Sequence, residues 1–391
     1  YDVLERIKLS IEVQLKEEPA GQVSDLIVPI EKITIELFKH TGGKAGNLGE
    51  IRNILKLPTP RGFSITVRAY KDFMSFNKIE DKINRLIGDL DINDAGKIDD
   101  VSEEILELIM KSKVPAEIEE KIYSEADKIG AQKGFAVRSS AVGEDGKISF
   151  AGQFRSILNV NKETVVEAYK QVIASKYSTR ALFYRLAKGI KDKDTPMAVF
   201  VLEMIDARSS GILYTLNPGH PEKDETIISA LWGQGQYAVS GTISPDMYIL
   251  DRNNNGEIVN RTISNKEVKL VLNPSGGVKE VPVPQESRGI SSISEQEIRM
   301  LYNLSCLIEK HFGVPQDIEW AIDENGLIQI LQARPLHIKR VISAVSPDTY
   351  YEQQLILSEG QIASRGIASG PVYVIDRIDR LSDFPSGAVM V

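Results

Sequence analysis

The sequence predicts an α+β protein of two or three lobes, and three observations lead to this fold class. The 391 residues are 42% hydrophobic and 26% charged, an ordinary globular composition that can fill two or three cores. Residues 79–130 are charged and amphipathic, which is typical of two or three helices. From Met197 onward, short apolar runs alternate with turn residues, which indicates mixed or antiparallel sheets.

The composition excludes several classes of function. The formal net charge is −8, so we expect no nucleic-acid or membrane partner, and an anionic ligand needs a local cluster of donors. No apolar run reaches about 18 residues, and the N-terminus lacks the basic flank and apolar core of a signal peptide. The single cysteine, Cys306, excludes an internal disulfide and suits a cytoplasmic protein. The histidines lie apart, without metal-ligand spacing: His40, His220, His311 and His337.

The first half of the chain is predicted to be mostly helical. A helix, a break at residues 18–21 and a second helix make up a leader over 1–38. The elements expected after it are a glycine turn and helix at 42–55, a Pro-rich turn, strand and helix at 57–74, the helices of 79–130, a buried strand at 135–138 and a helix within 163–189.

The second half is predicted to be rich in strands. The apolar runs AVFVLEMI and GILYTLN flank a hairpin-like turn at residues 206–210. Ser294 and Glu297 form a capping-box pattern at the start of a helix that ends at Gly313. The other expected elements are strands at ETIISALWG and DMYILDRNNNGEIVN, a loop at 274–294, a hairpin at 317–335, a helical linker at 346–360, and a turn and strand at RGIASGPVYVI.

These elements divide the chain into four parts. Residues 1–38 form the helical leader, 39–195 the first lobe and 196–340 the second lobe. Residues 341–391 form a linker and the beginning of a further domain, which stops inside the apolar run GAVMV.

The segment DIEWAIDENGLIQILQARP is predicted to be a hairpin that gathers polar side chains on one face. With a four-residue turn, Glu319 lies opposite Ile330 and Asp317 lies opposite Gln332. Carboxylate and amide oxygens suit Mg²⁺, a guanidinium suits phosphate, and a one-residue slip would turn these groups away. A solvated polar face without a ligand is the alternative that the residues leave open. The side chains that share this face are Asp317, Glu319, Gln332 and Arg334.

Arg138 offers a cation at the end of the buried strand 134–137, where a loop can hold a ligand on a rigid base. The loop that follows has three glycines between residues 143 and 152, which permit backbone N–H groups to surround phosphate. Its acidic residues, Glu144 and Asp145, would repel phosphate unless a cation offsets them. A surface turn before a strand is the alternative interpretation.

Two further glycine-rich segments give weaker signals. Gly42-Gly43-Lys44 lies before a helix and could deliver a cation to a nucleotide phosphate, but its spacing is not that of a P-loop. A structural turn is the alternative for this segment. Residues 232–236 form another glycine-rich loop, and a simple connection between strands explains it equally well.

Six segments, which together span about 40–337, match one protein family in order. They are GGKAGNLGEI, LPTPRGF, FAVRSSAVGEDGKISFAGQF, MAVFVLEMIDARSSGILYTLNP, WGQGQYAVSGTISPD and DIEWAIDENGLIQILQARP. On these residues the chain resembles the ATP-binding, ATP-grasp portion of phosphoenolpyruvate synthase and pyruvate phosphate dikinase. The later segment RGIASGPVYVI resembles the start of that family's swivelling phosphohistidine domain, truncated before its T-S-H-A signature.

The resemblance implies an ATP-grasp fold, with ATP and Mg²⁺ as ligands. It implies that Glu319 and Gln332 bind the metal, with Asp317 close by, and that Arg138 and Arg334 are catalytic because they neutralise charge on the transferring group. In the family, a carrier histidine on the swivelling domain takes the β-phosphoryl group of ATP, AMP leaves, and pyruvate or another small molecule is phosphorylated. The residues that would contact ATP are Lys44, Arg138, Glu203, Glu319, Gln332 and Arg334.

Two alternative functions remain beside a phosphoenolpyruvate-synthase-like dikinase. The same chemistry could serve another acceptor, phenol as in phenylphosphate synthase or an antibiotic as in rifamycin phosphotransferase. A nucleotide-sensing module without turnover is the other alternative. Leu202 stands where the family usually has Gln beside the adenine, and Gln236 where it often has Glu. The retained cations and metal ligands argue against a pure sensor.

Overall fold

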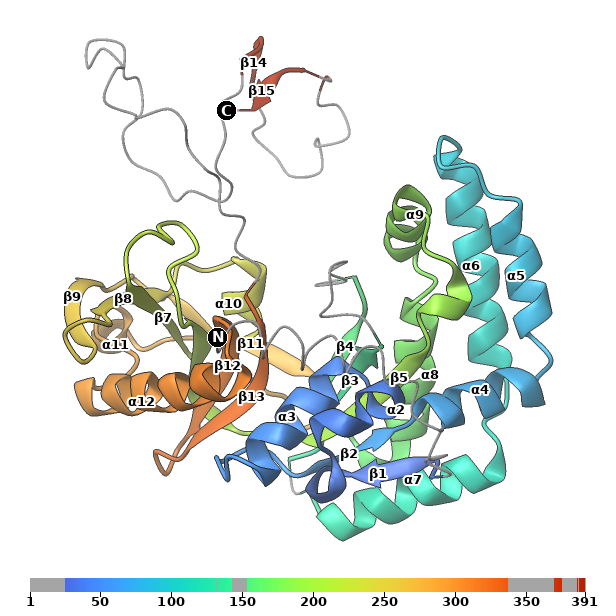
Figure 1. Cartoon of the computed structure of the whole chain (residues 1–391), viewed down its shortest axis with the longest axis horizontal. Coiled ribbons are helices and arrows are strands. Elements are labelled where there is room, and N and C mark those ends of the chain that lie inside the picture. The colour runs from blue at the N-terminus through green and yellow to red at the C-terminus, as the bar shows by residue number, and fades with distance from the viewer. Residues whose placement is uncertain are drawn as a thin grey trace, which may run out of the picture.

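The computed structural model describes residues 25–131, 133–142, 153–336, 369–374, 385 and 387–390. Within these residues, two antiparallel sheets of five and six strands form the body of the molecule. Figure 1 shows most helices beside the first sheet, while one long helix, α12 (Glu295–Phe312), flanks the second. The predicted α+β class is confirmed.

The first sheet has the strand order β1-β2-β5-β3-β4, and every neighbouring pair is antiparallel. β5 and β3 are buried on both faces, as expected of central strands, and the sequence of β5 is nearly all apolar. The strands are β1 (Ile27–Pro29), β2 (Gly62–Ile65), β3 (Phe135–Ala141), β4 (Ser156–Val160) and β5 (Met197–Glu203).

Six helices build a core on one face of this sheet. Three of them, α4, α7 and α8, contact the sheet, and the other three pack outside them. Their apolar stripes recur at helical spacing, so each helix buries one face. The helices are α4 (Val67–Phe76), α5 (Glu80–Gly88), α6 (Ala95–Lys111), α7 (Ala116–Ile129), α8 (Val165–Ser175) and α9 (Thr179–Lys188), with short 3₁₀ turns η3 (Lys162–Thr164) and η4 (Asp192–Asp194).

The second sheet has the order β13-β12-β6-β7-β8-β9, again antiparallel throughout. A separate two-stranded hairpin is formed by β10 (Val268–Leu272) and β11 (Val278–Pro282). The strands of the sheet are β6 (Ala207–Tyr214), β7 (Glu225–Trp232), β8 (Asp246–Asp251), β9 (Glu257–Thr262), β12 (Gln316–Asp323) and β13 (Ile328–Pro335), and the short helices of this half are α10 (Gln236–Ser240) and α11 (Gln285–Arg288).

Helix α12 confirms the predicted capping box. Ser294 Oγ accepts from the backbone N–H of Glu297, and the Glu297 carboxylate accepts from the backbone N–H of Ser294 at 2.7 Å. Both contacts satisfy N–H groups that a helix start leaves without intrahelical partners. The helix ends at Gly313, whose φ of 71° suits a residue without Cβ.

A second core lies between the two sheets. It joins Phe200 and Leu202 of the first sheet to Ile318 and Trp320 of the second, and it includes the buried face of α3 (Gly43–Asn53). The short helix α2 (Phe38–Thr41) leads into α3. The two lobes are therefore packed against each other through apolar side chains rather than joined only by the chain.

Several expectations differ from the structure. Within the leader over 1–38, the described part from residue 25 contains β1 and two 3₁₀ turns, η1 (Ile30–Lys32) and η2 (Ile35–Leu37), packed on the body. The boundary between lobes at 195/196 is also wrong, because β5 pairs with β2 and β3 of the first sheet. The 206–210 segment is no hairpin turn: β6 begins at Ala207, and the chain crosses there from one sheet to the other.

The loop expected at 274–294 contains β11 and α11, and the helical linker expected at 346–360 lies outside the described residues. In the segment RGIASGPVYVI, where a turn and a strand were expected, the structure has the strand β14 (Val372–Tyr373). It pairs in parallel with β15 (Val389–Met390). Among the described helices, none has the length and apolar character to cross a bilayer.

Candidate functional site

Arg138 and Glu319 meet between the two sheets. Arg138 projects from β3 and donates through Nη2 to Glu319 Oε2 on β12 at 2.8 Å. Their side chains are only 16% and 20% exposed, so solvent screens the pair weakly. The described parts of the two segments that the sequence singled out, 135–154 and 317–336, therefore contribute to one place in the fold, and the glycine-rich loop at 143–152 lies outside the described residues.

The register of β12 and β13 differs from the expected one. Glu319 lies opposite Gln332 and Asp317 opposite Arg334, because the extra residue Leu331 forms a β-bulge between two registers. The predicted common face of the four polar residues is nevertheless confirmed, since directly opposed residues point the same way. Without the bulge, the turn would pair Glu319 with Leu331 and turn Gln332 to the other face.

The four polar residues of this hairpin form a partly buried row rather than a solvated face. Arg334 donates through Nε and Nη2 to Asp317 Oδ2 at 2.9 and 2.6 Å. Gln332 is 5% exposed, and its Oε1 is buried without a hydrogen-bond partner in the described part of the chain. A buried amide oxygen without a partner carries a free-energy cost, which indicates a position for a ligand or metal.

Lys44 approaches the same place from the first turn of α3. Its Nζ donates to the Ser139 backbone oxygen and to Ser139 Oγ, both at 3.1 Å. Gly42 makes this approach possible: a Cβ there would lie 1.7 Å from the Ser140 carbonyl oxygen. The Gly-Gly-Lys turn thus packs the start of α3 directly against β3. The same turn therefore has a structural role and also brings the Lys44 cation to this place.

The carboxylates of Asp317 and Glu319 on β12 have opposite pKa shifts. Burial tends to raise the pKa of Glu319, but attraction to Arg138 and its hydrogen bond, with help from Lys44 and Arg334, holds the pKa below its usual value. Burial raises the pKa of Asp317, and Arg334 offsets this only in part. Glu319 is therefore held ionised at neutral pH inside a cluster of three cations.

A cavity of about 360 Å³ lies beside the Arg138–Glu319 pair. Its walls come from β3, β4 and β5 of the first sheet and from β6, β12 and the α10 segment of the second. The wall is largely apolar, which suits a flat, weakly polar group, and the ion pair marks its charged end. The apolar lining includes Ala136, Leu158, Leu202, Met204, Val239 and Leu331.

Glu203 lines the cavity, but its carboxylate is engaged elsewhere. Arg61 donates to both of its oxygens at 2.9 Å, and the Glu203 backbone N–H donates to the Arg61 carbonyl oxygen at 2.8 Å. Leu202, the residue that departs from the family pattern, is also in the wall, as is Gln236. Of the predicted site residues, Glu203 is the one that the structure keeps apart from the charged cluster.

Gln234 is a lining residue that sequence reasoning missed. Its Nε2 donates to the Ile205 carbonyl oxygen at 2.8 Å, and the residue is 7% exposed. It thereby fixes the segment that crosses between the sheets. The glycine-rich loop 232–236 was recognised, but no local pattern distinguishes this glutamine from Gln236.

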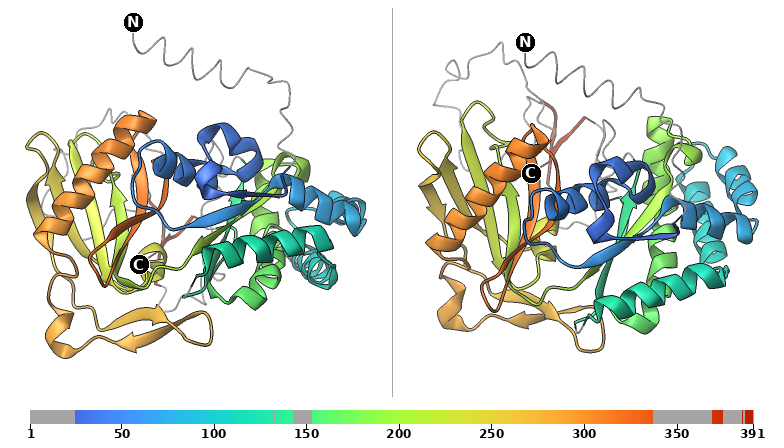
Figure 2. Two further views of the ribbon diagram at one scale, coloured as in Figure 1. Left: turned by 90° about the horizontal axis from the view of Figure 1, so that it is seen from below. Right: turned by 60° about the horizontal axis from the view of Figure 1, so that its bottom comes forward.

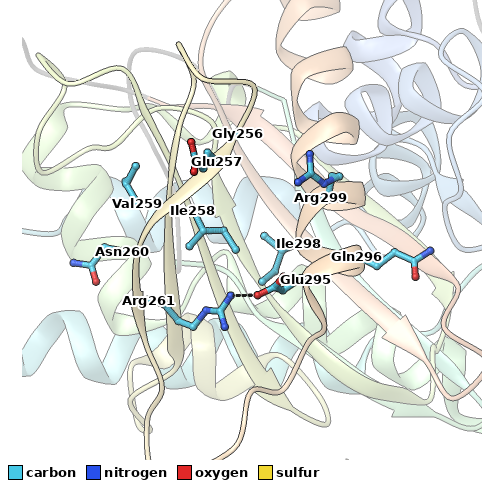
Figure 3. Close-up of a pocket in the computed structure, with 10 residues that line it drawn as sticks. All are labelled: Gly256, Glu257, Ile258, Val259, Asn260, Arg261, Glu295, Gln296, Ile298 and Arg299. Carbon is cyan, nitrogen blue, oxygen red and sulfur yellow. Dashed lines mark hydrogen bonds and ion pairs between the residues drawn. The ribbon is translucent and has the colours of Figure 1, made fainter.

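A second hollow, of about 600 Å³, lies between β9 and α12 (Figure 3). An ion pair between Arg261 and Glu295, at 2.6 Å, crosses it. It contains none of the predicted site residues and no buried polar group without a partner among its lining. The cavity beside the Arg138–Glu319 pair is the better candidate, because it has predicted site residues in its wall and, nearby, a buried amide oxygen without a partner in the described residues.

The donor set at the charged end fits Mg²⁺ better than a metal that needs a complete protein cage. The described residues contain no group of three or more His, Cys, Asp and Glu side chains that could hold a metal. They do offer the ionised Glu319 opposite the unpartnered Gln332 oxygen. Two protein oxygens supplemented by phosphate and water oxygens are the usual environment of Mg²⁺.

Residues 38–354 match the family described as the pyruvate phosphate dikinase AMP/ATP-binding domain. The chain is 35% identical over 382 residues to a probable phosphoenolpyruvate synthase of Methanocaldococcus jannaschii, a match that covers 95% of this chain and 32% of that protein. It is 38% identical over 364 residues to a probable phosphoenolpyruvate synthase of Archaeoglobus fulgidus, covering 90% and 47%. It is 31% identical over 387 residues to the phosphoenolpyruvate synthase of Escherichia coli, covering 94% and 49%.

The chain thus spans about a third to a half of the length of these relatives. Among solved structures, D-cycloserine synthetase matches at 10% identity with a TM-score of 0.24, over 55% of this chain and 52% of that one. A similarity of that size supports no comparison of the folds.

Proposed function

The chain belongs to the family of pyruvate phosphate dikinase AMP/ATP-binding domains, and on that premise we propose that it is the ATP-binding, phosphoryl-donating portion of a phosphoenolpyruvate-synthase-like dikinase. The observation that carries the proposal is the ionised Glu319 held among Arg138, Lys44 and Arg334 at the charged end of an apolar cavity. Two sheets with a nucleotide-sized cavity between them also suit an ATP-grasp fold.

The adenine would lie in the apolar part of the cavity, between Leu202 and Leu331. Leu202 offers no hydrogen bond to the base, so selectivity would come from backbone groups and from shape. The phosphates would then extend towards Arg138, where Lys44 and Arg334 add positive charge. Glu203, held by Arg61, would stabilise the cavity wall rather than touch phosphate.

Phosphoryl transfer depends mainly on positioning and on neutralisation of charge. Glu319 and Gln332 would hold Mg²⁺, which when bound would supply divalent positive charge to offset the charge of the phosphates. Arg138 and Arg334 would be catalytic in the sense that they touch the transferring group and offset its charge. On ATP binding, Arg138 would exchange part of its contact with Glu319 for a contact with phosphate.

A carrier histidine on a phosphohistidine domain, in a longer chain or in a separate subunit, would attack the β-phosphorus of ATP with loss of AMP. Cleavage of the β–γ bond by water would then release the γ-phosphate as inorganic phosphate and leave the β-phosphoryl group on the histidine. Pyruvate would be the final acceptor, because the relatives of this chain are named phosphoenolpyruvate synthases. Other acceptors, such as phenol or an antibiotic, use the same donor chemistry and have no support from those names.

Calorimetric titration with a non-hydrolysable ATP analogue, with and without Mg²⁺, tests the proposal directly. We expect micromolar, Mg²⁺-dependent binding to the chain, and loss of that binding in Arg334→Ala. Absence of binding to the parent chain would contradict the proposal. Exchange of label between ATP and AMP in the presence of the carrier domain then separates an enzyme from a nucleotide sensor, which would bind ATP without exchange.

A further inference from the structure

The cavity is bounded by two elements from opposite lobes that no sheet joins. β4, the edge strand of the first sheet, contributes Ser156 and Leu158. α10, which follows β7 of the second sheet, contributes Gln236 and Val239. Whatever fixes the separation of β4 and α10 therefore fixes the width of the cavity on this side.

The hairpin β10–β11 runs from the second lobe towards the first (Figure 2, golden strands). It is attached to the segment just before α10, where Gly233 pairs with Leu270 and the backbone N–H of Gln234 donates to the Leu270 carbonyl oxygen at 2.8 Å. Gly233 permits this approach, because a Cβ there would lie 2.2 Å from that oxygen.

The turn of the hairpin is held by Asn159 of β4. Asn159 Nδ2 donates to the carbonyl oxygens of Asn273 and Gly277 at 2.7 and 2.8 Å, and its own carbonyl oxygen accepts from the Gly277 backbone N–H at 3.1 Å. Asn159 is 6% exposed and has a φ of 53°, a conformation that Asn adopts more readily than most side chains. Both amide hydrogens of the Asn159 side chain are therefore donated to the hairpin.

The opposite edge of the hairpin is held by α10. The Tyr237 hydroxyl donates to a carboxylate oxygen of Glu280 on β11, and this contact raises the pKa of Tyr237. Leu158 of β4 and Leu272 of β10 pack against the same core between the sheets. The hairpin thus contacts both the β4 side and the α10 side of the cavity.

We propose that the β10–β11 hairpin is a strap that holds β4 and α10 together across the nucleotide cavity, and that Asn159 is the positioning residue on which the strap depends. The inference rests on the proposed function in so far as the ligand is ATP. A bound nucleotide packed between these walls leaves faster when they separate. Loss of the two hydrogen bonds donated by Asn159 should therefore raise the nucleotide dissociation rate by about 10-fold.

Two substitutions separate the hydrogen bonds from the backbone conformation. Asn159→Asp keeps the size of the side chain and its tolerance of positive φ, but it cannot donate. Asn159→Gly keeps the backbone conformation and removes the side chain. Tyr237→Phe releases the other edge of the strap at an exposed position. Asn255→Asp is the matched control, because Asn255 also has positive φ, at 48°, but lies in the exposed turn between β8 and β9.

Stopped-flow dissociation of a fluorescent ATP analogue from the chain, with Mg²⁺ present, provides the test. We expect a dissociation rate raised about 10-fold in Asn159→Asp and Asn159→Gly, about 3-fold in Tyr237→Phe, and unchanged in Asn255→Asp. Hydrogen exchange at residues 273–277 should slow when nucleotide binds to the parent chain.

Unchanged dissociation rates in both Asn159 variants would overturn the inference. A lowered melting temperature with an unchanged dissociation rate would show that the strap is structural only and would equally overturn it. If the parent chain fails to bind the analogue, the proposed function itself fails, and the strap inference falls with it; that result is recognised before any variant is compared.

Discussion

Glu319 is the residue on which the charge balance of the candidate site depends. Three cations surround it, and one of them, Arg138, has its Nε buried without a partner in the described residues. Neutralising Glu319 would leave excess positive charge in a partly buried place, while the ionised form provides the proposed metal ligand opposite Gln332. The ion pair is therefore better explained as a preorganised ligand site than as a source of stability.

Replacement of Glu319 or Arg334 by Ala should abolish phosphoryl transfer while the fold stays intact. Loss of a group that stabilises charge at a reacting centre typically lowers the rate by about 10²–10³-fold or more. The measurement is ATP–AMP exchange with the carrier domain, beside circular dichroism of the variant. Glu324→Ala, in the exposed turn of the same hairpin, is the control, and an unchanged exchange rate in Glu319→Ala would refute the assignment.

Gly42→Ala should destabilise the chain more than an ordinary glycine substitution. Gly42 has a φ of 78°, and a Cβ would lie 1.7 Å from the Ser140 carbonyl oxygen. Gly189→Ala is the matched control, because Gly189 has a φ of 64° but a Cβ there would meet nothing within 4 Å. Urea unfolding should show about 1–2 kcal/mol for the control and clearly more for Gly42→Ala. Equal losses would show that α3 can shift away from β3.

At the scale of the element, the β12–β13 hairpin depends on its bulge. The turn leaves Trp320 opposite Ile330, and because Leu331 bulges out of the ladder, Gln332 rather than Leu331 lies opposite Glu319. The bulge thus determines which side chain of β13 lies opposite Glu319, and it also increases the local twist of the strand. The polar face is a property of the paired strands, not of β13 alone.

Two single-residue deletions in β13 should therefore differ. Deletion of Leu331 removes the bulge but keeps Gln332 opposite Glu319 and Arg334 opposite Asp317, so Mg²⁺-dependent nucleotide binding should weaken by no more than about 10-fold. Deletion of Ala333 keeps Gln332 opposite Glu319 but moves Arg334 opposite Ile318, on the other face, and should abolish nucleotide binding. Calorimetric titration of both variants checks this, and equal binding by the two would contradict the register argument.

At the scale of the whole molecule, α3 joins the two lobes. Lys44 contacts Ser139 in the first sheet, and Asn47 Nδ2 donates to the Ala333 carbonyl oxygen in the second at 3.0 Å. Glu50 adds a contact with His311 of α12, also at 3.0 Å. The lobes are thus held by α3 on one side of the cavity and by the hairpin strap on another.

Outside the site, the stability of the helical lobe should depend on pH through Asp192. Burial tends to raise the pKa of Asp192, but Lys176 and Arg185 outweigh it and hold the pKa below its usual value. Because the folded pKa is lowered, this contribution to stability is complete above the unfolded pKa, about 3.9, and is lost as pH falls through the folded value. Asp192→Asn should cost about 3–5 kcal/mol at pH 7, since both cations stay buried.

Urea unfolding at pH 7 and at pH 3 measures this effect. The difference between the parent chain and Asp192→Asn should shrink at the lower pH. Asp127→Asn, which removes an exposed contact with Lys162, is the control and should change stability by less than about 1 kcal/mol. A constant difference between pH 7 and pH 3 would exclude Asp192 as the titrating group.

The sequence by itself determined the elements whose signals are local. Helical periodicity predicted α5 to α9, the capping box predicted α12, and alternation predicted β12 and β13 with their polar face. The motif order predicted the family, which the comparison bears out. These signals depend on neighbours within a few residues, so tertiary contacts did not need to be known.

Only the tertiary structure decided how distant segments pair. The assignment of β5 to the first sheet, the bulge at Leu331 and the contact of Asn159 with the hairpin turn all join residues that the chain separates. A strand pattern states which face is buried but not which strand lies beside it, because many pairings bury the same apolar area. Packing between the two sheets favours one of these strand pairings over the others, and the cavity forms between the two sheets that result.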